Sequence, residues 1–191
     1  MTSETETTGN DPRVVARERY ISWLKGGAPG RLHLAEPDGQ KICCSVTNGR
    51  GLLRLKTAWR RFWLAVGMYV TFSSWKVFFF RLSGVAIGKD VYIAHGVKLD
   101  WQAPWLITLE DGCTIGYEAV IAVHLYYRDK LILRRVNIGR GAVVGLRAIV
   151  AASMGQNSLL SPGSVLLADA PDGATMGGVP AKVLDWAGEP S

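Results

Sequence analysis

An aliphatic residue recurs at every sixth position through much of the second half of the chain. An α-helix repeats about every 3.6 residues and a strand about every two, so neither element alone produces this period. A short strand followed by a turn does fit a six-residue unit. The recurring residues fall into four runs of three: Ile87, Ile93 and Leu99; Leu109, Ile115 and Ile121; Ile138, Val144 and Val150; Met154, Leu160 and Leu166.

A second pattern is found two positions before each of these aliphatic residues, which we call the anchors. Residues two apart in a strand face the same side, so both sets would share one interior. Glycine follows several anchors and gives the backbone freedom where the chain bends. The residues two positions ahead are uncharged and small or β-branched: Val85, Val91, Val97, Ile107, Cys113, Ala119, Val136, Ala142, Ala148, Ala152, Ser158 and Ser164.

Three strands and three bends make a triangular coil of eighteen residues, and stacked coils pair their strands in parallel around a continuous apolar core. The sequence therefore predicts a mainly β domain, a parallel β-helix of about four coils over residues 85–167. An ordinary parallel sheet is the alternative. Its crossovers need helices, and residues 85–122 leave no room for them.

The repeat is interrupted at three places. Four extra residues lie within Asp100–Leu106, and two are missing between Val150 and Met154. The longest break, Val123–Arg135, predicts a loop that leaves the coil after Ile121. This loop carries a histidine.

The repeats, together with the closing segment Met176–Leu184 (MGGVPAKVL), resemble the hexapeptide-repeat acyltransferase superfamily. The resemblance covers residues 85–184 and is nearest to the maltose, galactoside and polysaccharide O-acetyltransferases. It implies left-handed coils, a homotrimer, and acetyl transfer from acetyl-CoA to a sugar or glycan hydroxyl without a metal.

Transfer of an acyl group to a hydroxyl needs a base for the hydroxyl proton, and His124 is the candidate. It lies three residues after Ile121, where similar acyltransferases carry their catalytic histidine. His33 and His95 are weaker candidates, since His33 lies outside the repeats and His95, on a turn, is expected to be a structural or surface residue. The carboxylates of Asp100 and Glu110 both stand near the neighbouring coil, and either could orient His124.

The resemblance also implies a site for acetyl-CoA. Its candidate residues are Gly145, Gly163, Gly178 and Lys182, with the lysine near the 3′-phosphate of the cofactor. The chain departs from the family pattern at Val143, where an aromatic residue is common, and at Leu167-Ala168, where a Thr-Lys pair is common.

The loop after His124 supplies the expected acceptor site, formed by Tyr126, Tyr127 and Arg128. A solvated loop without a binding role is the alternative. No cysteine or serine stands in the context of an acyl-carrying nucleophile, so direct transfer is expected. Cys113 fills a small-residue position of the predicted core.

The N-terminal part is expected to comprise a disordered tail (1–12) and an accessory segment (13–84), and the C-terminal tail covers 168–191. The accessory segment predicts a helix at 13–26, a hairpin at 31–46 around Asp38-Gly39, and an aromatic helix within 52–82. This aromatic segment would either pack against the β-helix or its trimer neighbour, or lie on a membrane surface with its basic residues toward lipid phosphates.

The remaining features bound the class of protein. The N-terminus lacks the order of a secretory signal and the three cysteines form no disulfide pattern, so we expect a cytoplasmic protein, with the inner membrane face as a second location. The net charge of +6 comes without a nucleic-acid-binding signature. Two other functions stay open: a trimeric β-helix scaffold or binding module, and a β-helix carbonic anhydrase, whose paired zinc-binding histidines have no counterpart here.

Overall fold

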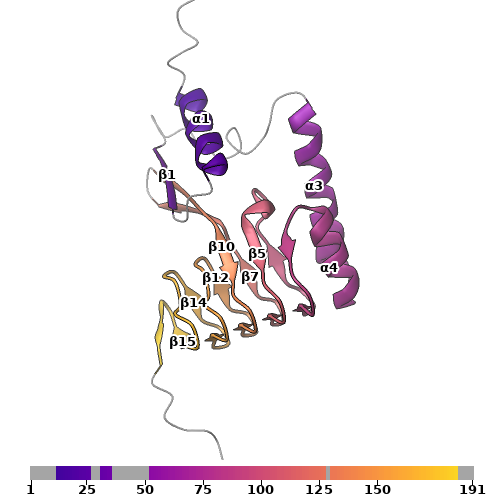
Figure 1. Ribbon diagram of the computed structural model, residues 1–191, viewed down its shortest axis with the longest axis vertical. Helices are drawn as coiled ribbons and strands as arrows, with labels where there is room; N and C mark the ends of the chain where they lie inside the picture. Colours follow the sequence, from indigo (N-terminus) through magenta and orange to yellow (C-terminus); the bar gives the residue numbers. More distant parts are fainter. Residues whose placement is uncertain (1–11, 27–30, 36–51, 128–129, 185–191) are drawn as a thin grey trace, which may run out of the picture.

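The computed structural model describes residues 12–26, 31–35, 52–127 and 130–184 of the protein, so the predicted N-terminal tail lies almost wholly outside them, whereas 168–184 of the predicted C-terminal tail are described. Within these described residues, a stack of short strands follows three helices and one N-terminal strand (Figure 1). The helices are α1 (Pro12–Lys25), α3 (Leu52–Tyr69) and α4 (Ser73–Leu82), with the 3₁₀ turn η2 (Pro104–Leu106) between coils. The strands are β1 (Arg31–Ala35), β2 (Ala86–Ile87), β3 (Tyr92–Ile93), β4 (Lys98–Leu99), β5 (Ile107–Leu109), β6 (Thr114–Ile115), β7 (Val120–Ile121), β8 (His124–Tyr127), β9 (Lys130–Arg134), β10 (Val136–Ile138), β11 (Val143–Val144), β12 (Ile149–Val150), β13 (Leu159–Leu160), β14 (Val165–Leu166), β15 (Thr175–Gly178) and β16 (Ala181–Val183).

Apart from β8, β9 and β16, the strands from β2 onward stack into three parallel sheets, one for each side of a coil. Their register places the predicted anchors one above another. In the third sheet, for example, Leu99 pairs with Ile121, Ile121 with Val150, and Val150 with Leu166. The anchors and the small residues ahead of them form one buried core along the stack. The predicted parallel β-helix is therefore confirmed.

The coils continue beyond residue 167, where the prediction ended them. Ala170 pairs in parallel with Met154, and Met176 pairs with Leu160. The four-residue step from Val150 to Met154 is thus repeated from Leu166 to Ala170. It marks a shortened corner of the coil rather than a fault in the repeat. After this partial fifth coil, β16 turns back and pairs antiparallel with β15.

Glycine is required at the bend that carries Gly145. A Cβ atom there would lie 2.6 Å from both the carbonyl oxygen of Leu160 and the backbone nitrogen of Pro162 in the next coil. Real Cβ atoms do not come so close to backbone atoms, so a side chain at this position would push two coils apart. This glycine has a stacking role in addition to any role at a cofactor site.

The aromatic segment forms two helices, not one. The first helix ends at Tyr69 and the second begins at Ser73. The two helices pack together, and the rings of Trp63 and Phe79 stack with 5.3 Å between their centroids. The close approach is possible because Gly67 faces Phe80, whose ring lies 2.6 Å from a Cβ built on that glycine. No helix in the described part of the chain is long and apolar enough to cross a membrane.

The helical hairpin covers the first coil (Figure 1). Leu64 and Phe80 are fully buried at this contact. Lys76 donates from Nζ to the carbonyl oxygen of Ala94 at 2.8 Å, and Arg81 donates to that of Gly88 at 2.6 Å. Of the two interpretations of the aromatic segment, packing against the β-helix thus describes its inner face.

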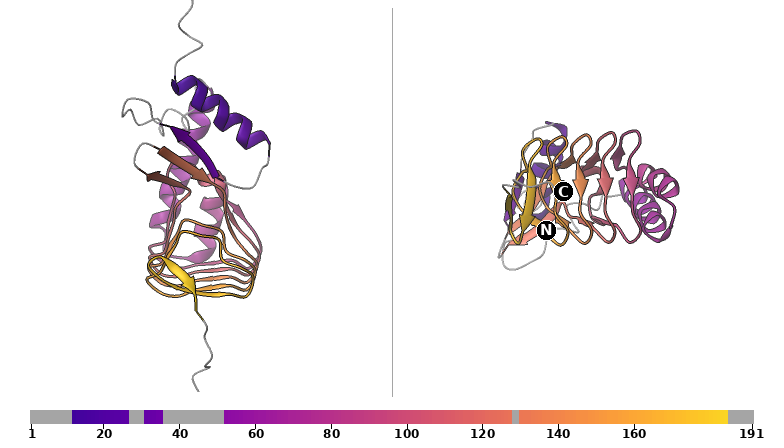
Figure 2. Two further views of the ribbon diagram at one scale, coloured as in Figure 1. Left: turned by 90° about the vertical axis from the view of Figure 1, so that its left-hand side faces the viewer. Right: turned by 90° about the horizontal axis from the view of Figure 1, so that it is seen from below.

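The strand β1 pairs with β9 of the loop that leaves the coil, and β9 pairs with β8. The result is a separate three-stranded antiparallel sheet beside α1 (Figure 2). The rest of the hairpin predicted around Asp38-Gly39 lies outside the described residues. The sheet and helix share a small core of their own, made of Ala16, Tyr20, Leu32, Leu34, Leu131 and Leu133.

We expect Gly145→Ala to lower the free energy of unfolding by about 3 kcal/mol, the upper end for an overpacked interior. Gly26→Ala, just after α1, is the control, because its new Cβ would lie 3.4 Å or more from its neighbours. That change should be neutral or stabilise by up to about 1 kcal/mol. Urea unfolding followed by circular dichroism measures both, and equal stabilities would contradict the stacking role.

Candidate active site

The predicted loop is a β-hairpin formed by β8 and β9. The chain leaves the second coil at the end of β7, and His124 is the first residue of β8. Alternate residues of β9, Leu131 and Leu133, are buried beneath α1. The alternative of a solvated loop therefore does not describe β9, because part of this strand is buried in a core.

Asp100 reaches this base from the coil before. Leu99 pairs with Ile121, so the residues that follow them leave adjacent coils at the same corner. The buried carboxylate of Asp100 accepts backbone N–H groups from Val123 at 2.8 Å and His124 at 3.1 Å through Oδ2. Its Oδ1 accepts the backbone N–H of Gln102 at 2.8 Å. The carboxylate is thus held by donors on two consecutive coils.

The same oxygen of Asp100 lies 2.6 Å from Nδ1 of His124. A carboxylate only accepts hydrogen bonds, so Nδ1 carries the proton in this pair. In the neutral ring, Nε2 then holds the free lone pair that a general base requires. The His124 side chain is 26% exposed, which leaves it accessible to a substrate.

The two groups shift each other's protonation. Burial of Asp100 opposes its ionisation, but the hydrogen bond from His124 and those from the backbone prevail and hold the pKa of the carboxyl below its usual value. The hydrogen bond to Asp100 raises the pKa of His124, although burial of the ring works in the opposite direction. A positioned imidazole whose protonated form is stabilised suits the abstraction of a proton from a hydroxyl.

Glu110, the other carboxylate considered for this role, is used elsewhere. It accepts the side-chain amide of Asn137 at 2.7 Å and the backbone N–H of Arg140 at 3.0 Å, which links the second and third coils. The orienting role of Asp100 could have been inferred from the repeat, because the aligned anchors Leu99 and Ile121 place Asp100 beside Ala122.

The predicted acceptor residues are only partly described. The ring of Tyr126 stands edge-on to His124, with 6.1 Å between centroids, and its side chain is exposed. Tyr127 belongs to β8, but its side chain lies outside the described residues, as does Arg128. Tyr126 is thus the predicted acceptor residue whose side chain can be placed beside the histidine.

A cavity of about 160 Å³ lies at the other face of the hairpin base. Successive residues of a strand face opposite sides, so Leu125 points away from the side that carries His124. Arg134 is anchored by Asp169, 2.5 Å from its guanidinium, and Arg31 donates to the carbonyl oxygen of Leu167 at 3.0 Å. The lining residues are Arg31, Ala122, Val123, Leu125, Ile132, Arg134, Ala151 and Leu167.

The predicted cofactor residues lie further along the stack than His124. Gly145 is in the third coil and Gly163 in the fourth, where its φ of +68° and open surroundings suit a turn glycine. Gly178 ends β15 and donates to Oγ of Ser164 at 3.1 Å. Lys182 is exposed on β16, opposite Gly177. At about 4.8 Å per coil, two or three coils separate Gly163 and Gly178 from the coil of His124, or roughly 10–14 Å.

Cys113 is buried in the core, and its burial raises the pKa of the thiol to about 12. At neutral pH it is therefore a protonated packing residue and not a nucleophile. Among the described residues, no three His, Cys, Asp or Glu side chains gather closely enough to hold a metal ion.

Comparisons with known proteins agree with this arrangement at the level of the fold. The chain is 26% identical over 124 residues to the Bacillus subtilis protein named "Putative acetyltransferase YvoF". The aligned region covers 63% of this chain and 72% of that protein. The hexapeptide-repeat-containing acetyltransferase VCA0836 from Vibrio cholerae superimposes with a TM-score of 0.61 at 16% identity, over 74% of this chain and 96% of that one. The chain has the hexapeptide-repeat acetyltransferase fold.

Two further solved structures extend the comparison. A maltose O-acetyltransferase from Clostridium difficile superimposes on this hexapeptide-repeat chain with a TM-score of 0.54 at 14% identity, over 72% of this chain and 89% of that one. VCA0836 complexed with acetyl coenzyme A gives a TM-score of 0.54 at 16% identity, over 74% and 92%. No protein-family model matches the chain.

We expect Asp100→Asn to lower the pKa of His124, because the carboxylate is the main cause of its elevation. A pH titration of the imidazole signals by NMR measures this, with His33 and His95 as internal references. An unchanged His124 titration would contradict the pairing.

The same variant should lose stability in a defined pH range. The pair stabilises the fold most between the ordinary values of the carboxyl, 3.8, and the imidazole, 6.5. As the pH rises through the raised pKa of His124, this contribution is lost, and as it falls through the lowered pKa of Asp100 it is lost again. The stability difference from wild type should therefore be greatest near pH 5, about 1–3 kcal/mol, and smaller at pH 9.

Proposed function

We propose that the protein transfers an acetyl group from acetyl-CoA to a hydroxyl of a sugar or glycan, with His124 as the general base. The observation that carries this proposal is the 2.6 Å contact between His124 and a buried carboxylate, at the base of a hairpin on a β-helix of this fold. The bound acetyl coenzyme A of one fold neighbour and the maltose acceptor of another support the choice of donor and acceptor class.

In the proposed reaction, Nε2 of His124 takes the hydroxyl proton as the acceptor oxygen attacks the thioester carbonyl. The C–S bond then breaks, the acetyl group stays on the acceptor oxygen, and the proton leaves with the thiolate of CoA. Asp100 keeps the proton of His124 on Nδ1 and stabilises the imidazolium that forms. General-base assistance of this kind is worth about 10²–10⁴-fold in rate.

We assign the donor to Gly145, Gly163, Gly178 and Lys182, whose separation along the stack suits an extended cofactor. Lys182 would face a phosphate. Leu167-Ala168 replaces the Thr-Lys pair of similar enzymes, and Arg31 and Arg134 bring positive charge to Leu167. Since Arg134 is paired with Asp169, the exposed guanidinium of Arg31 would take over the charge that the missing lysine provides.

We further propose a homotrimer in the cytoplasm, in which His124 of one subunit works with the donor residues of its neighbour. Tyr126, Tyr127 and Arg128 would contact the acceptor from the hairpin that carries His124. The position of Tyr126 beside the histidine supports this assignment.

The first test is thiol release from acetyl-CoA with a panel of sugars, amino sugars and nucleotide sugars. His124→Ala should reduce acceptor-dependent release by a factor of about 100 or more. His95→Ala is the matched control, because His95 is exposed on a turn of the first coil, and it should leave the rate unchanged. Circular dichroism establishes that both variants fold.

Two outcomes would oppose the proposal. Release that survives His124→Ala would exclude the histidine as the base. Wild type that binds no acetyl-CoA in calorimetry and releases no thiol would favour a trimeric scaffold or binding module instead.

A further inference from the structure

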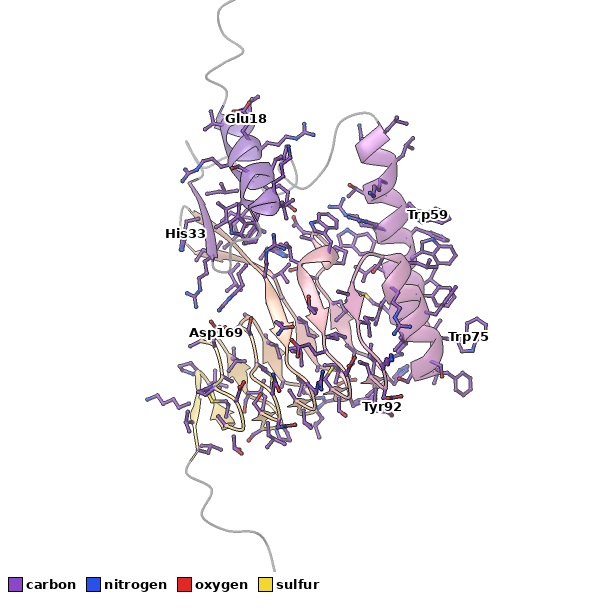
Figure 3. All side chains as sticks on the ribbon, in the orientation of Figure 1. Glu18, His33, Trp59, Trp75, Tyr92 and Asp169 are labelled. Atoms are coloured by element: carbon purple, nitrogen blue, oxygen red, sulfur yellow. The ribbon has the colours of Figure 1, made fainter. Side chains whose placement is uncertain are left out.

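The outward face of the α3–α4 hairpin carries aromatic side chains that the proposed function does not use. Trp59 and Trp75 are 57% and 58% exposed, and Phe62 and Phe78 are also more than half exposed. Figure 3 shows Trp59 and Trp75 pointing away from the coils. Large apolar side chains that gather on a surface in this way mark an interaction site.

The exposed apolar residues follow the helical period. On α3 they recur three, four or seven residues apart, and those of α4 recur three or four apart, while Leu64 and Phe80 lie on the buried sides. Each helix therefore has one apolar face toward the coils and a second toward solvent. The outward residues, which we call the aromatic face, are Leu52, Leu55, Trp59, Phe62, Tyr69, Phe72, Trp75, Phe78 and Leu82.

The rings of the aromatic face are braced by two half-buried neighbours, Trp63 and Phe79. Trp59 lies 5.2 Å from Trp63, and Trp75 lies 6.1 Å from Phe79, both measured between ring centroids. Because Trp63 stacks on Phe79, the rings form one connected set across both helices. The surface is thus formed in the folded chain and needs no rearrangement to bind.

The charge around the aromatic face has one sign. No Asp or Glu occurs from residue 39 to residue 89. Arg54 and Lys56 are exposed on the first turns of α3. Other cations hold the hairpin to the β-helix, among them Arg61, which donates to the carbonyl oxygen of Trp101. The basic residues of α3 and α4 are Arg54, Lys56, Arg60, Arg61, Lys76 and Arg81.

We propose that the aromatic face docks on the surface of an anionic lipid bilayer. Tryptophan and phenylalanine rings partition into the headgroup region, and basic residues beside them are attracted to lipid phosphates. A second copy of this chain fits less well, because a two-fold contact would bring the same cations against one another. With the inner faces of both helices committed to the coils, this docking is peripheral.

The test is co-sedimentation of the full-length protein with sucrose-loaded vesicles. We expect binding to vesicles of phosphatidylcholine with 30% phosphatidylglycerol, at least tenfold weaker binding to phosphatidylcholine alone, and release by 0.5 M NaCl. The assay needs no acetyl transfer, so its failure is distinct from failure of the proposed function. Equal binding to both compositions, or none to either, would overturn the proposal.

Two sets of variants divide the aromatic from the charge contribution. Trp59→Ser with Trp75→Ser should weaken binding at least tenfold, and Arg54→Gln with Lys56→Gln should weaken it only on anionic vesicles. Phe72→Ser, in the exposed turn between the helices, guards against misfolding and should also weaken binding. Tyr117→Ser is the matched control, because Tyr117 is an exposed aromatic residue of the second coil.

Far-UV circular dichroism and the unfolding midpoint must match wild type for the comparison to count. If folded Trp59→Ser/Trp75→Ser protein sediments with vesicles as wild type does, the aromatic face is not the lipid contact. Sedimentation velocity in solution gives the other outcome: self-association that the tryptophan variant abolishes, without vesicle binding, would assign the face to a second copy and reject the lipid proposal.

Discussion

The in-register pairing of one coil on the next is the constraint on which the rest of the protein depends. Each coil repeats its predecessor at about 4.8 Å, so a residue at a corner stands directly beneath its counterpart one coil later. Insertions can leave the stack only at such corners. The insertion after Leu99 and the hairpin after Ile121 leave at the same corner of successive coils, and for that reason Asp100 and His124 meet. The site is a consequence of the register.

The hydrogen bonds around the buried carboxylate of Asp100 explain why its position relative to His124 is well defined. An ion removed from water is costly unless its lone pairs are taken up, and a carboxylate that lacks donors would become neutral. Asp100 instead receives backbone N–H groups from Val123, His124 and Gln102, together with the imidazole. Because three of these donors belong to the backbone, the position of the carboxylate does not depend on flexible side chains. The hydrogen bond to Asp100 in turn fixes the orientation of the His124 ring.

The β-helix was largely predictable from the sequence, because its core residues repeat in one dimension and the register follows from their spacing. The four-residue step from Leu166 to Ala170 also carried a readable signal, since it copies the step from Val150 to Met154. Both steps had to be recognised as a shortened corner before the fifth coil became apparent.

Contacts between segments that are distant in the sequence could not be predicted from it. The pairing of β1 with β9 joins residues about one hundred positions apart, and neither strand has a sequence pattern that identifies the other as its partner. The break between α3 and α4 also escaped prediction, because the apolar residues continue across it and the deciding feature is the fit of Phe80 against Gly67. His124 could be selected because it stands three residues after Ile121 in the sequence. Its partner Asp100 could be identified only by aligning the corner after Leu99 with the corner after Ile121.

In the described part of the chain, different elements cover the two ends of the stack, and this bears on how the protein avoids polymerisation. A β-helix ends in strands whose N–H and C=O groups could template another chain. The α3–α4 hairpin covers all three strands of the first coil, while β16 covers β15 at the opposite end. Growth of a fibre by end-to-end addition needs a free edge on both partners. One closed end is enough to prevent it, and α3 and α4 therefore also serve as a terminator for the β-helix.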